Sequence, residues 1–359
     1  MYAALLAIVL NLLSRDVTCA QGERQTSDLP DSGLLFFATY RYRDNAEATK
    51  NPYITGALLS FHWSQIEESE GEYNWSDVDD RMKLWVDAGK KVALRIVWSA
   101  NGMWLDPWAK HPTPQWVWDE GAAMAFSEDT KTEVPLQWGP IYKKHAFAFI
   151  QEMARHYDGN PNVLFVDVSP GGETNPYRGS INRRDTKFKE IFSNTTASDG
   201  TKYSDDLWVA TVKEYIDRCA EAFKRAQIGV TLNRGSLQGP ERFVEIGEYA
   251  VSEGLYVGQN GLSKNSYLRD SSWRRAFAAW DPRTKFYFEM VARSGSRTGT
   301  LMEVMKAAER IHCSYLGVYP EDVLKGTKGQ KNYDPEFEAA LKYGASIIGK
   351  PVVIPSGVK

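Results

Sequence analysis

Two glutamates occupy positions where a protein with a parallel sheet places reactive side chains. Glu173 follows the apolar run 163–168 after a Ser-Pro-Gly-Gly turn, and Glu289 directly follows the aromatic run 286–288. The glycines permit an unusual backbone turn before Glu173. The aromatic residues that precede Glu289 direct its side chain toward a packed site. Two carboxyl groups around one substrate are what glycoside hydrolysis requires: an acid protonates the leaving oxygen, and a carboxylate attacks or activates water. The alternative is a pair of ordinary loop glutamates.

Other common catalytic and cofactor-binding patterns do not occur in the sequence. There is no Gly-x-Ser-x-Gly elbow, Walker phosphate loop, His-Glu-x-x-His motif or Cys-x-x-Cys pair. The five histidines show no ligand spacing, so we expect no metal site and no other cofactor. No lysine ends a predicted strand, which disfavours an aldolase-like barrel enzyme.

Eight predicted strands alternate with segments of helical period, and this alternation must position the two glutamates. The strand-like runs cover residues 34–39, 56–61, 92–97, 163–168, 228–232, 255–258, 286–288 and 315–318. The pattern predicts an α/β fold, a single-domain (β/α)8 TIM barrel. An open doubly wound sheet is the competing fold, but the first strand is not followed by the Gly-rich turn of a nucleotide-binding sheet.

Long insertions follow predicted strands three, four and six, at residues 99–140, 171–204 and 260–284. In a (β/α)8 barrel, the loops after the strands form the face where active sites are assembled. Strands four and seven are expected to face each other there, so that Glu173 and Glu289 approach a substrate from opposite sides.

Other side chains that follow predicted strands are candidates for binding a substrate at the same mouth. Aromatic faces stack on the apolar faces of pyranose rings, and Trp98, directly after strand three, is the best candidate for such a platform. About half of the tryptophans in this region are instead expected to pack the long loop. The candidates for hydroxyl recognition are His62, Trp63, Asn175, Asn233, Gln259, Asn260 and Tyr319.

Some charged and thiol residues are expected to be structural. Arg95 and Asp167 lie within neighbouring predicted strands and should pair, because charged residues are rarely buried alone. The acidic cluster formed by Glu67, Glu68, Glu70 and Glu72 is expected to be a solvated loop. Cys219 and Cys313 are expected to be two buried, unpaired thiols.

Composition points to a globular enzyme or binding protein with a neutral partner. The chain has 359 residues and a net charge of -3, which gives no electrostatic reason to bind nucleic acid or an anionic membrane. It also has 12 Trp, 18 Tyr and 15 Phe, many for a core alone, and exposed aromatic faces suit sugars. The sequence therefore favours a carbohydrate partner.

The first twenty residues resemble a secretory signal peptide, with a short apolar run and small residues before Gln21. The run lacks a preceding Lys or Arg, so an uncleaved N-terminal anchor is the alternative. We expect residues 1–20 to be the signal, 21–31 a polar segment and 32–355 the catalytic barrel. The mature protein would be secreted or extracytoplasmic, with no membrane association after cleavage.

Predicted strands two and three and the segment between them contain the runs Trp63-Ser64-Gln65-Ile66-Glu67, Gly71-Glu72-Tyr73-Asn74-Trp75-Ser76, Asp79 and Ala88-Gly89-Lys90-Lys91-Val92. This pattern resembles that of the clan-A retaining glycoside hydrolases, and within them the β-galactosidase families. Beyond strand four the resemblance is positional only. The resemblance implies an O-glycosyl hydrolase that cleaves a β-linked glycan or galactoside with retention, with Glu173 as acid/base and Glu289 as nucleophile.

One departure from the clan's pattern leaves two alternatives open. The clan usually has Asn immediately before the acid/base glutamate, where it contacts the sugar 2-hydroxyl, and this chain has Gly172. Asn175 or Asn233 is the candidate replacement. Because the contact is missing, a catalytically inactive glycan-binding barrel is one alternative. The Gly-Gly-Glu turn also resembles the Gly-Glu of inverting β-amylases, so an inverting two-glutamate barrel hydrolase is the other.

Overall fold

A computed structural model of the chain describes residues 29–38, 46–100, 107–178, 185–233 and 241–350. The predicted signal peptide and residues 21–28 of the predicted polar segment lie outside this part. Within it, no helix combines the length and apolar character needed to cross a membrane.

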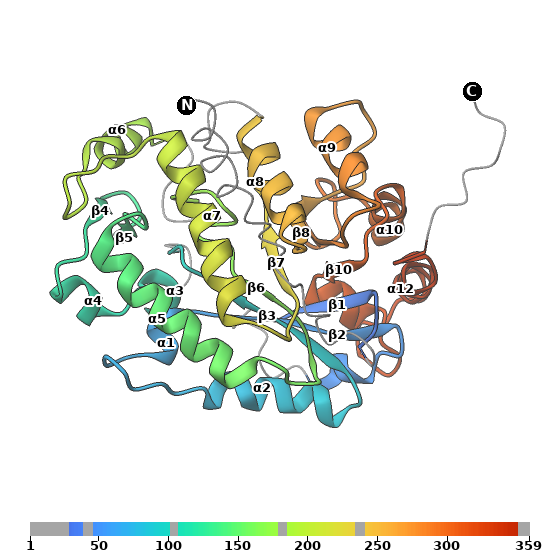
Figure 1. Ribbon diagram of the computed structural model, residues 1–359. Coiled ribbons are helices and arrows are strands. Elements are labelled where there is room, and N and C mark those ends of the chain that lie inside the picture. Colours follow the sequence, from blue (N-terminus) through green and yellow to red (C-terminus); the bar gives the residue numbers. More distant parts are fainter. Residues whose placement is uncertain (1–28, 39–45, 101–106, 179–184, 234–240, 351–359) are drawn as a thin grey trace, which may run out of the picture.

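Eight parallel strands close into a barrel, which confirms the predicted fold (Figure 1). Every predicted strand is present close to its predicted position. In order around the barrel, the strands are β1 (Gly33–Ala38), β2 (Ile54–Phe61), β3 (Lys91–Ile96), β6 (Val163–Asp167), β7 (Ile228–Thr231), β8 (Tyr256–Leu262), β9 (Phe286–Met290) and β10 (Tyr315–Val318).

Helices connect the strands and surround the barrel, as the alternating pattern predicts (Figure 1). The longer ones are α2 (Ser76–Asp87), α5 (Pro140–Tyr157), α7 (Asp205–Ala222), α8 (Glu241–Ser252), α10 (Leu301–Arg310) and α12 (Pro335–Ile347). The shorter ones are η2 (Ala46–Lys50), α1 (Trp63–Ile66), α3 (Pro107–Lys110), α4 (Gln115–Asp119), α6 (Thr186–Asn194), α9 (Ser272–Trp280) and α11 (Pro320–Lys325).

The three long insertions follow β3, β6 and β8, as predicted. The first contains α3, α4 and a two-stranded antiparallel sheet, β4 (Met124–Ser127) with β5 (Thr132–Pro135). The second contains α6, and the third contains α9. All three extend from the carboxyl ends of the strands, where barrel enzymes place their sites.

The barrel interior changes from apolar to polar along the strands. Side chains alternate between the two faces of a strand, so residues two apart share a face. A buried cluster fills the inner layer, with Leu35, Leu58, Ala93, Phe165, Tyr256, Tyr287 and Tyr315 among its members. Two residues after cluster members on four of the strands stand Ser60, Arg95, Asp167 and Glu289, and on β7 Thr231 stands two residues after Gly229. The layer nearest the mouth is therefore charged and hydrogen-bonding.

Two glycines make room for Tyr287 at the base of this polar layer. A Cβ on Gly229 would lie 2.7 Å from the Tyr287 ring, and a Cβ on Gly258 would lie 2.6 Å from it. Tyr287 consequently fills the centre of the barrel, with its hydroxyl 3.0 Å from Oγ1 of Thr231. The tyrosine forms the floor on which the polar layer rests.

The segment that carries the sequence resemblance packs outside the barrel. Trp63 is fully buried, and its Nε1 donates to Oε2 of Glu67 at 2.6 Å, while Oε1 of Glu67 accepts from the amide of Gly71 at 2.9 Å. Glu67 is only 2% exposed, so its assignment to a solvated loop is wrong, although Glu68, Glu70 and Glu72 are exposed. The shared motif thus contains a buried hydrogen-bonded turn that packs between β2 and α5.

The two cysteines of the described barrel are buried, unpaired thiols, as predicted. Cys219 lies on the buried face of α7, and Cys313 directly precedes β10, with its Sγ 3.0 Å from the carbonyl oxygen of Tyr315. Burial raises the pKa of both thiols, so neither is a reactive thiolate at neutral pH.

Candidate active site

Glu173 is at the tip of a two-residue hairpin just after β6. The amide of Gly172 donates to the carbonyl of Asn175 at 2.7 Å, and the amide of Asn175 donates to the carbonyl of Gly172 at 3.2 Å. Between them, Glu173 and Thr174 both have φ of 58°. Such turns normally use Asn or Gly, because left-handed backbone costs other residues about 1–2 kcal/mol each. The strain marks this turn as a functional candidate.

The surrounding structure holds this hairpin in place. Thr174 is fully buried; its carbonyl accepts from Nε1 of Trp208 at 2.8 Å, and its Oγ1 accepts from the amide of Asn233 at 3.2 Å. The side chain of Asn175 accepts from the amide of Tyr177 at 3.1 Å. These contacts compensate for the local strain and fix where the Glu173 side chain points.

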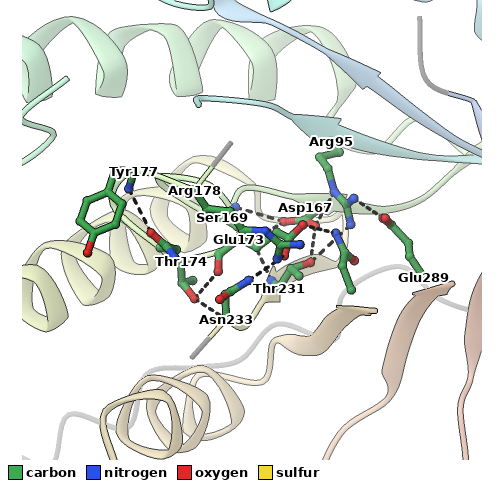
Figure 2. A network of polar contacts seen from close by, with 12 residues as sticks. Arg95, Asp167, Ser169, Glu173, Thr174, Tyr177, Arg178, Thr231, Asn233 and Glu289 are labelled. Carbon is green, nitrogen blue, oxygen red and sulfur yellow. Dashed lines mark hydrogen bonds and ion pairs between the residues drawn. The ribbon is translucent and has the colours of Figure 1, made fainter. Parts of the chain in front are cut away.

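The carboxylate of Glu173 has partners on both oxygens. Nδ2 of Asn260 donates to Oε1 at 2.6 Å, and Nδ2 of Asn233 donates to Oε2 at 3.1 Å. Arg178 forms an ion pair with Oε2, and Figure 2 shows its guanidinium beside Glu173. The hairpin, β7 and β8 therefore all contribute to the position of this carboxylate.

Glu289 points into the barrel from β9 and is only 3% exposed. Gly317 on the adjacent β10 makes room for it, since a Cβ there would lie 2.9 Å from Cγ of Glu289. Burial raises the pKa of Glu289, and the ion pair with Arg95 opposes that rise (Figure 2). A buried carboxylate with a single guanidinium partner is suited to act as a nucleophile or base.

Arg95 also pairs with Asp167, which confirms that predicted partnership. Nε of Arg95 lies 2.8 Å from Oδ2 of Asp167, and both residues are buried. Oγ1 of Thr231 donates to the same oxygen at 2.7 Å, and Oγ of Ser169 donates to Oδ1 at 2.5 Å. Both oxygens of Asp167 are therefore hydrogen-bonded, and Arg95 lies between Asp167 and Glu289 with an ion pair to each.

Glu173 and Glu289 line one cleft of about 340 Å³ at the carboxyl ends of the strands. Their strands, β6 and β9, are three positions apart in the barrel, so the expectation that they lie directly opposite is wrong. Asn260 connects the two glutamates: it pairs in register with Glu289 across β8 and β9, and its side chain reaches Glu173. Both carboxyl groups thus belong to the same site.

The predicted substrate-binding residues divide into two groups. Asn260 and Tyr319 line the cleft, and Asn233 contacts Glu173 directly. Oδ1 of Asn260 is buried with no hydrogen-bond partner among the described residues, so it can accept from a ligand. Asn175 instead shapes the hairpin.

The other candidates are absent from the cleft lining. Trp98 is 1% exposed and packs edge-on against Trp63 and Phe149, so it offers no face to a sugar, and the predicted platform there is wrong. His62 and Trp63 are equally buried, and Trp63 packs outside the barrel. Gln259 is bonded to the hydroxyl of Tyr267 and is not part of the cleft lining.

Several polar residues of the site were not predicted from the sequence, among them Ser169, Arg178, Thr231 and Arg297. The position of Thr231 could have been predicted, because it is the last residue of strand five and shares the inward face of that strand with Gly229. Ser169 and the two arginines lie in loops without periodicity, where sequence gives no direction for a side chain. Among the described residues there is no group of three or more His, Cys, Asp or Glu placed to hold a metal ion.

Comparison with known proteins gives a consistent relationship. Residues 43–216 match the family model described as β-galactosidase, Glyco_hydro_42. The chain is 28% identical over 195 residues to β-galactosidase BbgII of Bifidobacterium bifidum. Residues 43–216 are therefore similar to β-galactosidase-type glycoside hydrolases. That match covers 53% of the chain and only 24% of the relative, so this chain spans about a quarter of its relative's length.

Solved structures of glycoside hydrolases share the fold of this chain. The catalytic domain of a Paenibacillus polymyxa β-amylase has a TM-score of 0.64 at 12% identity, covering 90% of this chain and all of that one. A β-galactosidase from the psychrophilic Marinomonas ef1 has a TM-score of 0.50 at 14% identity, covering 88% of this chain and 59% of that one. At these identities the likeness establishes the barrel alone.

Proposed function

We propose that the protein hydrolyses O-glycosidic bonds in a β-linked glycan or galactoside, with Glu173 and Glu289 as the two catalytic carboxyl groups. The observation that carries the proposal is their shared cleft at the carboxyl ends of β6 and β9. The match to the β-galactosidase family model supports the reaction class.

In this proposal Glu289 is the nucleophile and Glu173 the acid/base. Glu289 attacks the anomeric carbon as Glu173 donates a proton to the leaving oxygen, giving a covalent glycosyl-enzyme. Glu173 then removes a proton from water, which attacks the same carbon and releases Glu289. Arg95 stabilises the ionised form of Glu289 before the attack and again after release.

Retention is the favoured stereochemistry because one asparagine connects the two glutamates. Asn260 is the neighbour of Glu289 across the strand pair, and its amide lies 2.6 Å from Glu173. Direct attack, as in retaining enzymes, requires carboxyl groups about 5–5.5 Å apart, whereas inverting enzymes hold theirs about 6.5–9.5 Å apart. We also propose that residues 1–20 direct the protein to secretion.

A hydrolysis screen tests this function. The purified protein is incubated with nitrophenyl β-glycosides and β-linked glycans, and released nitrophenol or reducing ends are measured, with Glu173→Gln as the control for a contaminating activity. NMR of the first product formed reports its anomeric configuration. We expect hydrolysis with the β-anomer formed first. The α-anomer would support inversion, and binding without hydrolysis of any glycan would favour a non-catalytic glycan-binding barrel.

A further inference from the structure

One guanidinium in the cleft lining has no carboxylate partner among the described residues. The charged lining of the cleft consists of three carboxylates and three guanidiniums, namely Asp167, Glu173, Glu289, Arg95, Arg178 and Arg297. Arg95 is shared by Asp167 and Glu289, and Arg178 pairs with Glu173. Arg297 forms no hydrogen bond or ion pair within the part of the chain that the structure describes. The three carboxylates and three guanidiniums balance in number, and Arg297 is the cation among them that is left for a ligand.

Arg297 is held at the cleft by an ordered loop between β9 and α10. The amides of Gly295 and Gly299 each donate to the other's carbonyl, at 3.0 and 2.7 Å, so that they close the base of the turn containing Arg297. Asp322, 2% exposed, accepts from both the amide and Oγ of Ser294 at 2.7 and 2.9 Å. The fold thus holds the backbone of the turn from which the exposed Arg297 side chain extends.

The backbone also fixes the position of Arg178. A Cβ on Gly172 would lie 2.5 Å from the carbonyl oxygen of Arg178 and 2.8 Å from its Cβ. The space that a side chain at position 172 would occupy is therefore filled by Arg178, whose guanidinium reaches Glu173. Arg178 can occupy this position in the site because residue 172 is a glycine.

The Arg178 ion pair suits only half of the proposed catalytic cycle. An adjacent guanidinium favours the ionised form of a carboxyl group, which is the form that acts as a base. A general acid must carry a proton when the glycosidic bond breaks. A substrate that draws Arg178 away from Glu173 would remove this conflict, and the group that competes with a carboxylate for a guanidinium is another anion.

We propose that the glycan carries an anionic substituent, a carboxylate or a sulfate ester, that binds Arg297 and Arg178 in the cleft. This inference rests on the proposed function and names its substrate class. The anion forms charge-assisted hydrogen bonds with Arg297 and takes over Arg178 from Glu173. The released Glu173 carboxylate then takes up a proton from solvent and can donate it to the leaving oxygen. The overall net charge of -3 favours a neutral partner, but the charges that a bound ligand meets are those of the cleft.

The test compares charged polymers with their neutral counterparts. Affinity electrophoresis measures retention of the full chain in gels that contain a polyuronate, its carboxyl-reduced form, a sulfated galactan, or its desulfated form. Reducing-end release is measured on the same four polymers. We expect stronger retention by the charged member of at least one pair, and the pair that shows it distinguishes carboxylate from sulfate. We expect faster cleavage of that same member.

Two variants distinguish binding of an anion in the cleft from its binding to general surface charge. Arg297→Gln should reduce the charged-over-neutral ratio of binding by about tenfold or more, since it removes a charge-assisted contact. Arg293→Gln is the matched control, because Arg293 is exposed on the same loop but does not line the cleft, and it should leave the ratio unchanged.

Each outcome bears on one proposal or the other. Equal or stronger retention by the neutral member of both pairs, or no retention by either charged polymer, overturns the inference, even if neutral glycosides are hydrolysed. An equal effect of Arg297→Gln and Arg293→Gln overturns it as well. Selective retention of a charged polymer without cleavage of any glycan would support the anion site and contradict the proposed hydrolysis.

Discussion

Arg95 on β3 forms an ion pair with Glu289 on β9, the strand directly opposite β3 in the eight-stranded ring. The guanidinium therefore spans the barrel interior above the ring of Tyr287. Because the same guanidinium also binds Asp167 on β6, one side chain ties together three strands of the barrel. This contact connects the stability of the barrel to the chemistry of its mouth.

Loss of Arg95 is expected to destabilise the fold. Arg95→Met leaves Asp167 and Glu289 buried without their cation, and breaking a buried pair in this way costs about 3–5 kcal/mol. The midpoint of thermal unfolding should fall clearly for this variant. Arg293→Met, at an exposed site, should change stability by less than about 0.5 kcal/mol. Equal melting temperatures for the two variants would contradict the structural role of Arg95.

The pH dependence of hydrolysis should report Glu289. Burial raises its pKa and Arg95 opposes the rise, so the group ionises above its usual value of 4.5. A nucleophile must be ionised, and kcat/KM should therefore fall on the acid side at a pH above that value. In Arg95→Gln the opposing cation is lost, so the acidic limb should move to higher pH. A limb that stays in place or moves to lower pH would show that another group controls it.

The same shift has a consequence for stability. Because burial raises the folded-state pKa of Glu289 above the unfolded value, the folded state binds the proton more tightly. This contribution to stability is complete below the unfolded pKa and is lost as pH rises through the folded pKa. The glutamine of Glu289→Gln cannot ionise. The melting temperature of this variant minus that of the native protein should therefore rise between about pH 4 and pH 7, a range that begins near the usual pKa of glutamate. A falling difference would contradict the sign.

A methyl group at position 172 should disturb the hairpin. In Gly172→Ala the new Cβ would lie 2.5 Å from a backbone oxygen of Arg178, which has little freedom to move. We expect a lower melting temperature and weaker hydrolysis, because the turn that carries Glu173 must shift. Gly295→Ala is the control for stability, since its Cβ would come no closer than 4.0 Å to other atoms. Equal stabilities would show that the hairpin adapts.

Replacement of Trp98 should lower the stability of the fold and leave substrate binding unchanged. It is buried against Trp63, Phe149 and Tyr215, so Trp98→Ala should cost about 3–5 kcal/mol through the cavity left behind. KM should change little in the folded fraction, because the ring does not line the cleft. A large rise in KM with normal stability would restore the role of a sugar platform.

The sequence predicts the barrel and the positions of both glutamates because these depend on strand periodicity. Each β strand is an apolar run between helical segments, and a residue at its carboxyl end reaches the mouth. The same periodicity, counted from Arg95, would have placed Trp98 on the outer face, since it lies an odd number of residues further along. Gln259, one residue before Asn260, faces outward for the same reason.

The rest of the site depends on loop geometry that no sequence period describes. Arg178 reaches Glu173 only because the turn at Gly172 folds back on itself, and Arg297 reaches the cleft only because Gly295 and Gly299 pair. Both arrangements are set by backbone contacts between residues three to six positions apart. Their side-chain directions follow from tertiary structure alone.

The most direct test of the account is the turnover of three variants on a glycoside that the native protein hydrolyses. Glu173→Gln should lower kcat by about 10²–10⁴-fold and Glu289→Gln by at least about 10³-fold. The double variant should be little worse than the poorer single one, since the two groups act as a unit. Glu68→Gln, at an exposed glutamate outside the cleft, should retain full turnover. Near-native kcat in either single cleft variant would contradict the two-carboxylate mechanism.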